Sequence, residues 1–239
     1  SIVICKTSLK SILFLVVVTI CFGNNLALAQ PNFNFSGFGQ VVVGHLDESH
    51  ANYQSYDKGW SMEPQSLIGL QGEVTLTDTI SVNSQLIGFT NSSQNSGISW
   101  LYLSYQPTDN LQLKIGKNKT PFFNYSDVIN VGFSYPWITP PQQVYSGYMF
   151  DSFDGIFARY DIPNKFLEMN IEAYWGNYNG DYDIGEDNVS VDVEDLRGMI
   201  FNGSINQFNL RASYHTGHGH VKVQRLAGFI DALYNAGFG

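Results

Sequence analysis

The stretch SLIGLQGEVTLTDTISVNSQLIGF (residues 66–89) is the part of the chain that decides the fold class. Apolar residues and glycine fill most even positions from Ile68 to Gly88, and polar residues fill most odd positions from Gln71 to Gln85. Because side chains alternate between the two faces of a strand, this pattern predicts two strands, joined at residues 77–79, with one apolar and one polar face each. In a soluble protein the apolar face meets a core, whereas in an outer-membrane barrel it meets lipid and the polar face lines a water-filled lumen.

The first 29 residues predict a secretory signal peptide. Lys6 and Lys10 precede an apolar run at residues 12–23, and Ala27-Leu28-Ala29 supplies a small-residue cleavage site before Gln30. The apolar run is too short to cross a bilayer as a helix. We therefore expect export, with residues 30–239 as the mature domain.

Composition excludes several classes of protein. The two cysteines, Cys5 and Cys21, both lie in the predicted leader, which leaves neither a disulfide framework nor a thiolate metal site. The formal net charge is −9 and no basic stripe is present, so nucleic acid is not expected as a partner. No apolar stretch after residue 29 reaches the length of a membrane-spanning helix, so a membrane location would require strands.

Alternation and turn residues predict nine strands in the chain. Long polar connections follow the first, third, fifth and seventh strands, and tight turns follow the others. This strict order is typical of a transmembrane antiparallel β-barrel, in which one rim carries short turns and the other carries long loops. The expected strands cover about residues 33–44, 66–76, 80–89, 98–105, 111–115, 154–160, 167–175, 196–202 and 208–215.

The C-terminal end follows a different pattern. Between Val221 and Gly239, apolar residues recur at helical spacing, which predicts a short amphipathic helix. Nine strands cannot close an even-numbered single-chain barrel. We therefore interpret residues 30–239 as the N-terminal part of a longer barrel.

The segment of residues 117–152 is the candidate functional element. It contains nine aromatic residues and four prolines, too many rings for a freely solvated loop. The simplest place to bury these rings is the interior of the barrel, where the segment would narrow the lumen.

The chain resembles the outer-membrane porins of Gram-negative bacteria in the leader, the Phe35-Ser36-Gly37-Phe38-Gly39 strand, the short-turn hairpins, and the sequence Gly116-Lys117-Asn118-Lys119-Thr120-Pro121-Phe122-Phe123 that leads into the long loop. The resemblance implies a barrel of sixteen strands when complete, a homotrimer, and a loop after the fifth strand that folds into the pore. It also implies outer-membrane lipid and lipopolysaccharide as surroundings, and small hydrophilic solutes or ions as cargo.

A porin constriction places acidic loop residues opposite basic wall residues, creating a field that sorts ions. The alternation of the predicted strands places the bases Lys114, Arg159 and Arg211 on the inward face. It places the acids Glu73, Glu168 and Glu172 there as well. Each single charge also has the plainer interpretation of a hydrated lumen or rim residue. The residues that we expect at the constriction or in the lumen are Lys114, Lys117, Lys119, Asp127, Asp151, Asp154, Arg159 and Arg211.

Two further clusters could bind metal ions. Residues 181–195 hold seven carboxylates, for which a solvated external loop is the default interpretation and divalent-cation bridging to lipopolysaccharide is the alternative. His215, His218 and His220 are separated by flexible glycines, which preorganise a site poorly. We predict no resident metal and no cofactor.

The sequence favours a porin that passes small hydrophilic solutes by diffusion. Two alternatives stay open: a non-conducting outer-membrane barrel used in adhesion or scaffolding, and a soluble exported β-sandwich that binds glycans. The sequence contains no Ser-His-Asp order typical of a catalytic triad, no glycine-rich phosphate loop and no convincing metal triad, so we do not expect an enzyme.

Overall fold

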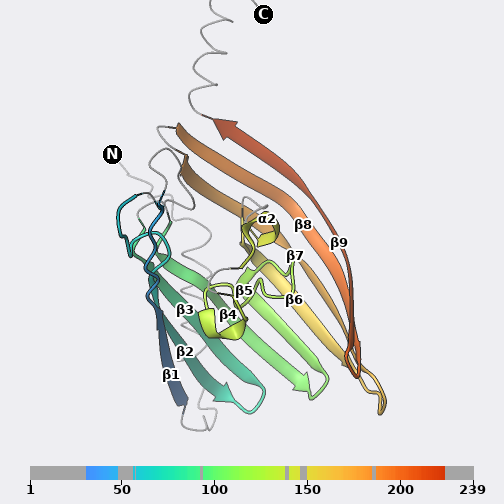
Figure 1. The fold of residues 1–239 in the computed structure, drawn as a ribbon. Helices are drawn as coiled ribbons and strands as arrows, with labels where there is room; N and C mark the ends of the chain where they lie inside the picture. Colours follow the sequence, from blue (N-terminus) through green and yellow to red (C-terminus); the bar gives the residue numbers. More distant parts are fainter. Residues whose placement is uncertain are drawn as a thin grey trace, which may run out of the picture.

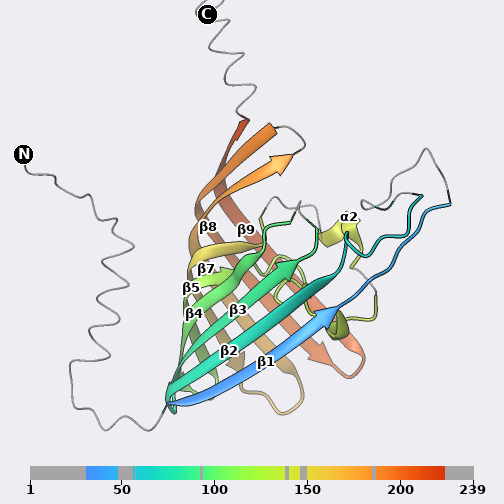
Figure 2. The ribbon, with the colours of Figure 1, turned by 90° about the vertical axis from the view of Figure 1, so that its left-hand side faces the viewer.

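In the part of the chain that the structure describes, nine strands form a single antiparallel sheet in the order β1 to β9. The computed structural model describes residues 31–47, 56, 58–91, 94–137, 140–145, 150–184 and 187–223. The sheet curves into a trough, and the segment between β5 and β6, which carries helix α2, lies on its concave side (Figures 1 and 2). The strands are β1 Asn32–Gln40, β2 Leu67–Thr77, β3 Ile80–Phe89, β4 Gly97–Thr108, β5 Leu111–Lys119, β6 Ser152–Ile162, β7 Glu168–Ile184, β8 Asp187–Ile205 and β9 Phe208–Val223; the 3-10 helix η1 is Gly132–Ser134 and α2 is Gln142–Tyr145.

The hairpin predicted from residues 66–89 is confirmed as β2 and β3. Leu70 opposes Leu86 and Gln71 opposes Gln85, so each face carries matching chemistry on both strands. At the turn the backbone N–H of Thr79 donates to the Thr77 hydroxyl over 3.3 Å. The predicted all-β fold class is likewise confirmed by the nine paired strands.

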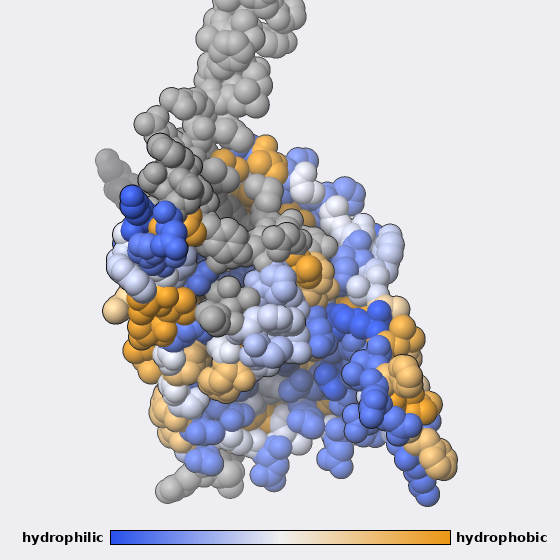
Figure 3. Space-filling view, in the orientation of Figure 1, coloured by the Kyte–Doolittle hydropathy of each residue, from blue (hydrophilic) through white to orange (hydrophobic). Residues whose placement is uncertain are grey.

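An apolar row crosses the convex face of the sheet. From β3 to β7 the directly opposed residues are Val82, Leu103, Ile115, Ile156 and Trp175. Ile115 is 56% exposed and Trp175 is 58% exposed, so these side chains do not form a core. Figure 3, which looks into the trough, shows hydrophilic residues over much of its lower interior and hydrophobic residues along both flanks.

The expectation of a polar loop at residues 181–195 is wrong. Strands β7 and β8 continue through this region as a paired ribbon, with Asp181 opposite Ser190 and Asn179 opposite Asp192. A register shift between Glu194 and Arg197 accommodates an extra residue, and Asp195 there has a φ of 51°. A bulge of this kind reverses the parity of the strand, because one residue is left outside the ladder. The long connection predicted after the seventh strand is therefore mostly strand.

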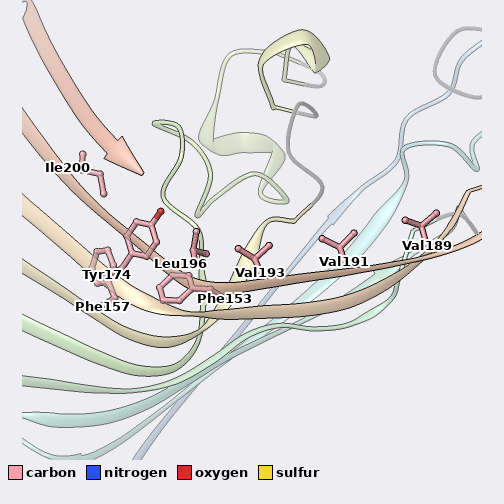
Figure 4. Close-up of a cluster of buried hydrophobic side chains, with 8 residues drawn as sticks. All are labelled: Phe153, Phe157, Tyr174, Val189, Val191, Val193, Leu196 and Ile200. Carbon is pink, nitrogen blue, oxygen red and sulfur yellow. The ribbon is translucent and has the colours of Figure 1, made fainter. Parts of the chain in front are cut away.

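A buried apolar cluster lies on the concave side of β6, β7 and β8. Ile200 is fully buried and Phe153 is 1% exposed. Val189, Val191 and Val193 project from one side of β8 (Figure 4). Phe150 and Tyr178 pack against the cluster, whose buried members are Phe153, Phe157, Tyr174, Val189, Val191, Val193, Leu196 and Ile200.

Two expectations concern the ends of the chain. The predicted signal peptide at residues 1–29 lies outside the described residues, as does most of the predicted helix at residues 221–239. Its first three residues, 221–223, belong to β9 instead. Among the described residues, no helix combines the length and the apolar character needed to cross a bilayer.

Gly155 and Gly176 oppose each other in the ladder between β6 and β7. A Cβ added at Gly155 would overlap the Trp175 carbonyl oxygen, whereas one added at Gly219 of β9 would meet nothing within 4 Å. We expect Gly155→Ala to lower the free energy of unfolding by about 1–3 kcal/mol. Gly219→Ala should change it by less than about 1 kcal/mol.

Urea unfolding followed by tryptophan fluorescence measures both substitutions. Equal midpoints for the two variants would contradict the close approach of β6 and β7.

Candidate functional site

A cavity of about 880 Å³ lies between the concave face of the sheet and the β5–β6 segment. Its wall residues come from β2, β4, β5, β6, β7, β8 and β9, and its remaining residues come from positions 121–131 of the segment. The inward parity predicted for Lys114, Arg159 and Arg211 places all three in this lining, together with Glu168 and Glu172. Glu73, also predicted to face inward, is not among the lining residues.

Arg159 of β6 is held by two carboxylates. Its Nη2 lies 2.8 Å from Asp161 Oδ1, and its Nη1 lies 3.3 Å from Glu172 Oε1 on the neighbouring strand. Asn202 of β8 donates its amide to Asn170 Oδ1 over 2.8 Å and lies 3.4 Å from Glu172 Oε1. The wall therefore carries a connected row of charged and amide groups across β6, β7 and β8.

Arg211 of β9 connects the wall to the loop. Its Nη1 donates to Asn202 Oδ1 over 2.9 Å, and its Nη2 donates to the Pro121 carbonyl oxygen over 2.7 Å. A guanidinium presents several donors in one rigid plane, which lets it serve both partners at once. Arg211 thus fixes the start of the β5–β6 segment against a strand 90 residues further along the chain.

Lys114 of β5 points into the cavity between two rings. Its Nζ lies 4.9 Å from the centroid of Tyr102 and 5.1 Å from that of Phe157, at distances typical of cation–π contacts. Asp127, from the β5–β6 segment, lines the same cavity. The structure therefore brings the predicted basic wall residue and the predicted acidic loop residue to one space.

Aromatic contacts hold both ends of the segment on the β7–β9 side of the trough. Phe122 packs edge-on against His215 of β9, with ring centroids 5.2 Å apart. Phe150 stacks on Tyr178 of β7 at 4.9 Å, and Phe122 meets Phe150 at 5.5 Å. His215 Nδ1 also lies 2.8 Å from the Tyr174 hydroxyl. Phe122 and Phe150 therefore pack against other rings, as the sequence predicted for aromatic residues of this segment.

A second ring cluster fills the body of the segment. Tyr125 lies at its centre, 5.8 Å from Trp137 and 6.2 Å from Tyr135, and Tyr145 lies 5.3 Å from Phe123. The Tyr135 hydroxyl donates to the Ile129 carbonyl oxygen over 2.9 Å, and burial raises the pKa of that hydroxyl. The segment therefore has packing of its own in addition to its attachment to the wall.

The four predicted residues at the ends of the segment divide into two pairs. Lys119 lines the cavity and forms an ion pair with Asp151. Lys117 and Asp154 oppose each other between β5 and β6 in the parity of Ile115 and Ile156, and neither lines the cavity. Lys117 Nζ instead donates to the Ile98 carbonyl oxygen over 2.9 Å.

The predicted histidine cluster is divided between the two faces of β9. His215 packs against the loop, whereas His218 opposes Glu194 and His220 opposes Asp192, at positions of the opposite parity. In the part of the chain that the structure describes, no three His, Cys, Asp or Glu side chains come together in a group that could hold a metal ion.

Sequence reasoning did not single out the amides of the cavity. Gln71, Gln112, Asn170, Asn202 and Asn209 all occupy inward positions of predicted strands and line the space. The sequence signal that could have found these amides is their position on the same strand faces as Lys114, Arg159 and Arg211.

Known proteins offer little to compare. No protein-family model matches the chain, and no curated protein matches it. The chain is similar to a solved structure of a loop L8 deletion mutant of OmpT, an outer membrane protein of Vibrio cholerae, with 12% identity and a TM-score of 0.35 over 81% of this chain and 72% of that one. A likeness of this size carries no argument about activity.

The hydrogen bond from Arg211 to Pro121 should hold the start of the β5–β6 segment closed. A hydrogen bond from a charged donor contributes about 1.5–3 kcal/mol. We therefore expect Arg211→Ala to speed chymotrypsin cleavage after Phe122, which is buried, by about tenfold or more.

Arg197→Ala is the matched control, because Arg197 lies on the opposite face with a side chain that is 59% exposed. Mass spectrometry of timed digests identifies the cut. Equal cleavage rates after Phe122 in both variants would show that Arg211 does not fasten the segment.

Proposed function

We propose that this chain forms the wall of an outer-membrane channel for passive diffusion of small hydrophilic solutes or ions, narrowed by the segment of residues 117–152. The observation that carries the proposal is the contrast between the two faces of one sheet. The convex face exposes apolar side chains from strand to strand, while the concave face carries charges and amides around a cavity. Lipid on one side and water on the other satisfy both faces.

Backbone chemistry supports the same location. Each strand from β2 to β8 pairs with a neighbour on both sides, which satisfies the backbone groups that a bilayer cannot hydrate. An exposed apolar surface of more than a few hundred Å² is rare on a soluble monomer. Export by a leader, residence among lipid and lipopolysaccharide, and assembly as a homotrimer are parts of this proposal that rest on the sequence and its resemblance.

The alternative of a soluble glycan-binding sandwich requires two packed sheets. The described residues form one sheet, whose concave side faces a loop and a cavity. A non-conducting barrel for adhesion or scaffolding has one observation in its favour, which is the ring packing of residues 122–150 inside the trough. Ion current separates this alternative from a channel.

Reversal potential in a salt gradient tests the channel and its charges together. At 0.1 M salt the Debye length is about 10 Å, so a charge in the narrow part of the path acts strongly on passing ions. Lys114→Gln removes a positive charge from the cavity and should shift the potential toward cation selectivity. Asp127→Asn should shift it toward anion selectivity.

Lys117→Gln and Asp154→Asn are matched controls, because these two residues do not line the cavity. We expect their shifts to be severalfold smaller than those of Lys114→Gln and Asp127→Asn. Absence of single-channel current from the unaltered protein in a planar bilayer would overturn the channel. Equal shifts in all four variants would remove the cavity from the ion path.

A further inference from the structure

We propose that the cavity binds uncharged, polyhydroxylated solutes of the size of a sugar. This inference rests on the proposed function for placing the cavity on a diffusion path, and it adds the chemical class of solute that the lining selects. The volume of the cavity, about 880 Å³, lies within the range of about 300–1,000 Å³ typical of small-molecule sites.

Amide side chains are the commonest polar groups of the lining. They come from β2, β5, β7, β8 and β9 and from the β5–β6 segment, and include Gln71, Gln112, Asn124, Asn170, Asn202 and Asn209. A carboxamide both donates and accepts hydrogen bonds. A hydroxyl has the same dual capacity, so a ring of amides is complementary to a solute that carries many hydroxyls and no charge.

The cationic groups of the lining are already engaged within the protein. Arg159 contacts two carboxylates, Lys119 pairs with Asp151, and Arg211 donates to Asn202 and to the Pro121 carbonyl oxygen. Lys114 lies between the rings of Tyr102 and Phe157. An anionic solute would have to compete for these groups, whereas a neutral solute leaves the contacts intact.

Aromatic rings supply the apolar part of the site. Trp100 and Tyr102 of β4 lie 5.3 Å apart with their planes at 33°, and both line the cavity. Phe157 of β6 and Phe123 of the loop add two further rings. Pyranose rings present flat C–H faces between their hydroxyls, and such faces pack on aromatic rings while the hydroxyls meet the amides.

Short peptides are the other solutes that amides would recognise. A free peptide carries a charged amino group and a charged carboxylate, each of which needs an unengaged countercharge on binding. The lining's arginines and Lys119 are engaged as described, so the carboxylate of a peptide would have to displace an existing contact, whereas a neutral polyol would not.

The test uses cellobiose as the probe in planar bilayers that contain the unaltered protein. We expect cellobiose to reduce the ion current in a saturable manner, and equimolar ethylene glycol or dialanine not to do so. Trp100→Ala should raise the cellobiose concentration needed for half block roughly three- to tenfold, because the ring contact is lost. Trp175→Ala should leave it unchanged, because Trp175 is exposed on the convex face.

Tryptophan fluorescence in detergent gives a second readout that needs no current. Cellobiose should alter the emission saturably, and Trp100→Phe should abolish the change. Should Trp100→Ala fail to fold by circular dichroism, Gln112→Leu, which removes an amide at nearly constant volume, takes its place with the same expected weakening.

The outcomes separate the two proposals. Current without saturable block, or equal block by dialanine, overturns sugar binding and leaves the channel standing. A saturable fluorescence change without any current overturns the channel and leaves binding standing.

Discussion

The structure depends on one constraint, which is that every strand of a single sheet presents two faces of different chemistry at once. The backbone ladder fixes this, because paired strands cannot rotate their side chains from one face to the other. Val82, Leu103 and Ile115 therefore share the convex face across three strands, and Lys114 cannot avoid the concave one. A one-residue slip in any ladder would place charges among the apolar rows.

The concave face is not uniformly polar. Its β6–β8 part carries a buried apolar cluster against which Phe150 of the β5–β6 segment packs, while Phe122 attaches the segment to His215 of β9. The cavity between the segment and the sheet is still lined from Gln71 of β2 to Arg211 of β9. A loop rich in rings can therefore narrow the space without filling all of it.

Strand parity was sufficient to predict the local part of the site. The inward placement of Lys114, Arg159 and Arg211 follows from the alternation of their strands alone. Lys117 and Asp154 share the parity of Ile115 and Ile156, which alternation assigns to the convex side. Their nearness in sequence to the long loop does not bring them into the cavity. Distant contacts such as Phe122 with His215 have no sequence signal, because the packing of the folded loop decides them.

The ribbon at residues 181–195 could be predicted only in part. Val189, Val191 and Val193 alternate with Ser190, Asp192 and Glu194, which is a strand signal that the density of carboxylates obscured. The bulge at Asp195 then reverses the parity before Ile200, so the two halves of β8 could not be joined by alternation. The positive φ of Asp195 accompanies the register shifts in its ladders with β7 and β9, which the local sequence does not reveal.

We infer that the convex face contacts acyl chains while the concave face contacts water. A nitroxide placed in turn at each position from Phe208 to Tyr214 of β9, in protein reconstituted in lipid, measures it most directly. We expect high collision rates with oxygen at residues 208, 210, 212 and 214, and with a water-soluble nickel chelate at residues 209, 211 and 213. Exclusion of both reagents from the even positions would mean that these side chains pack in a dry protein interior, and would contradict it.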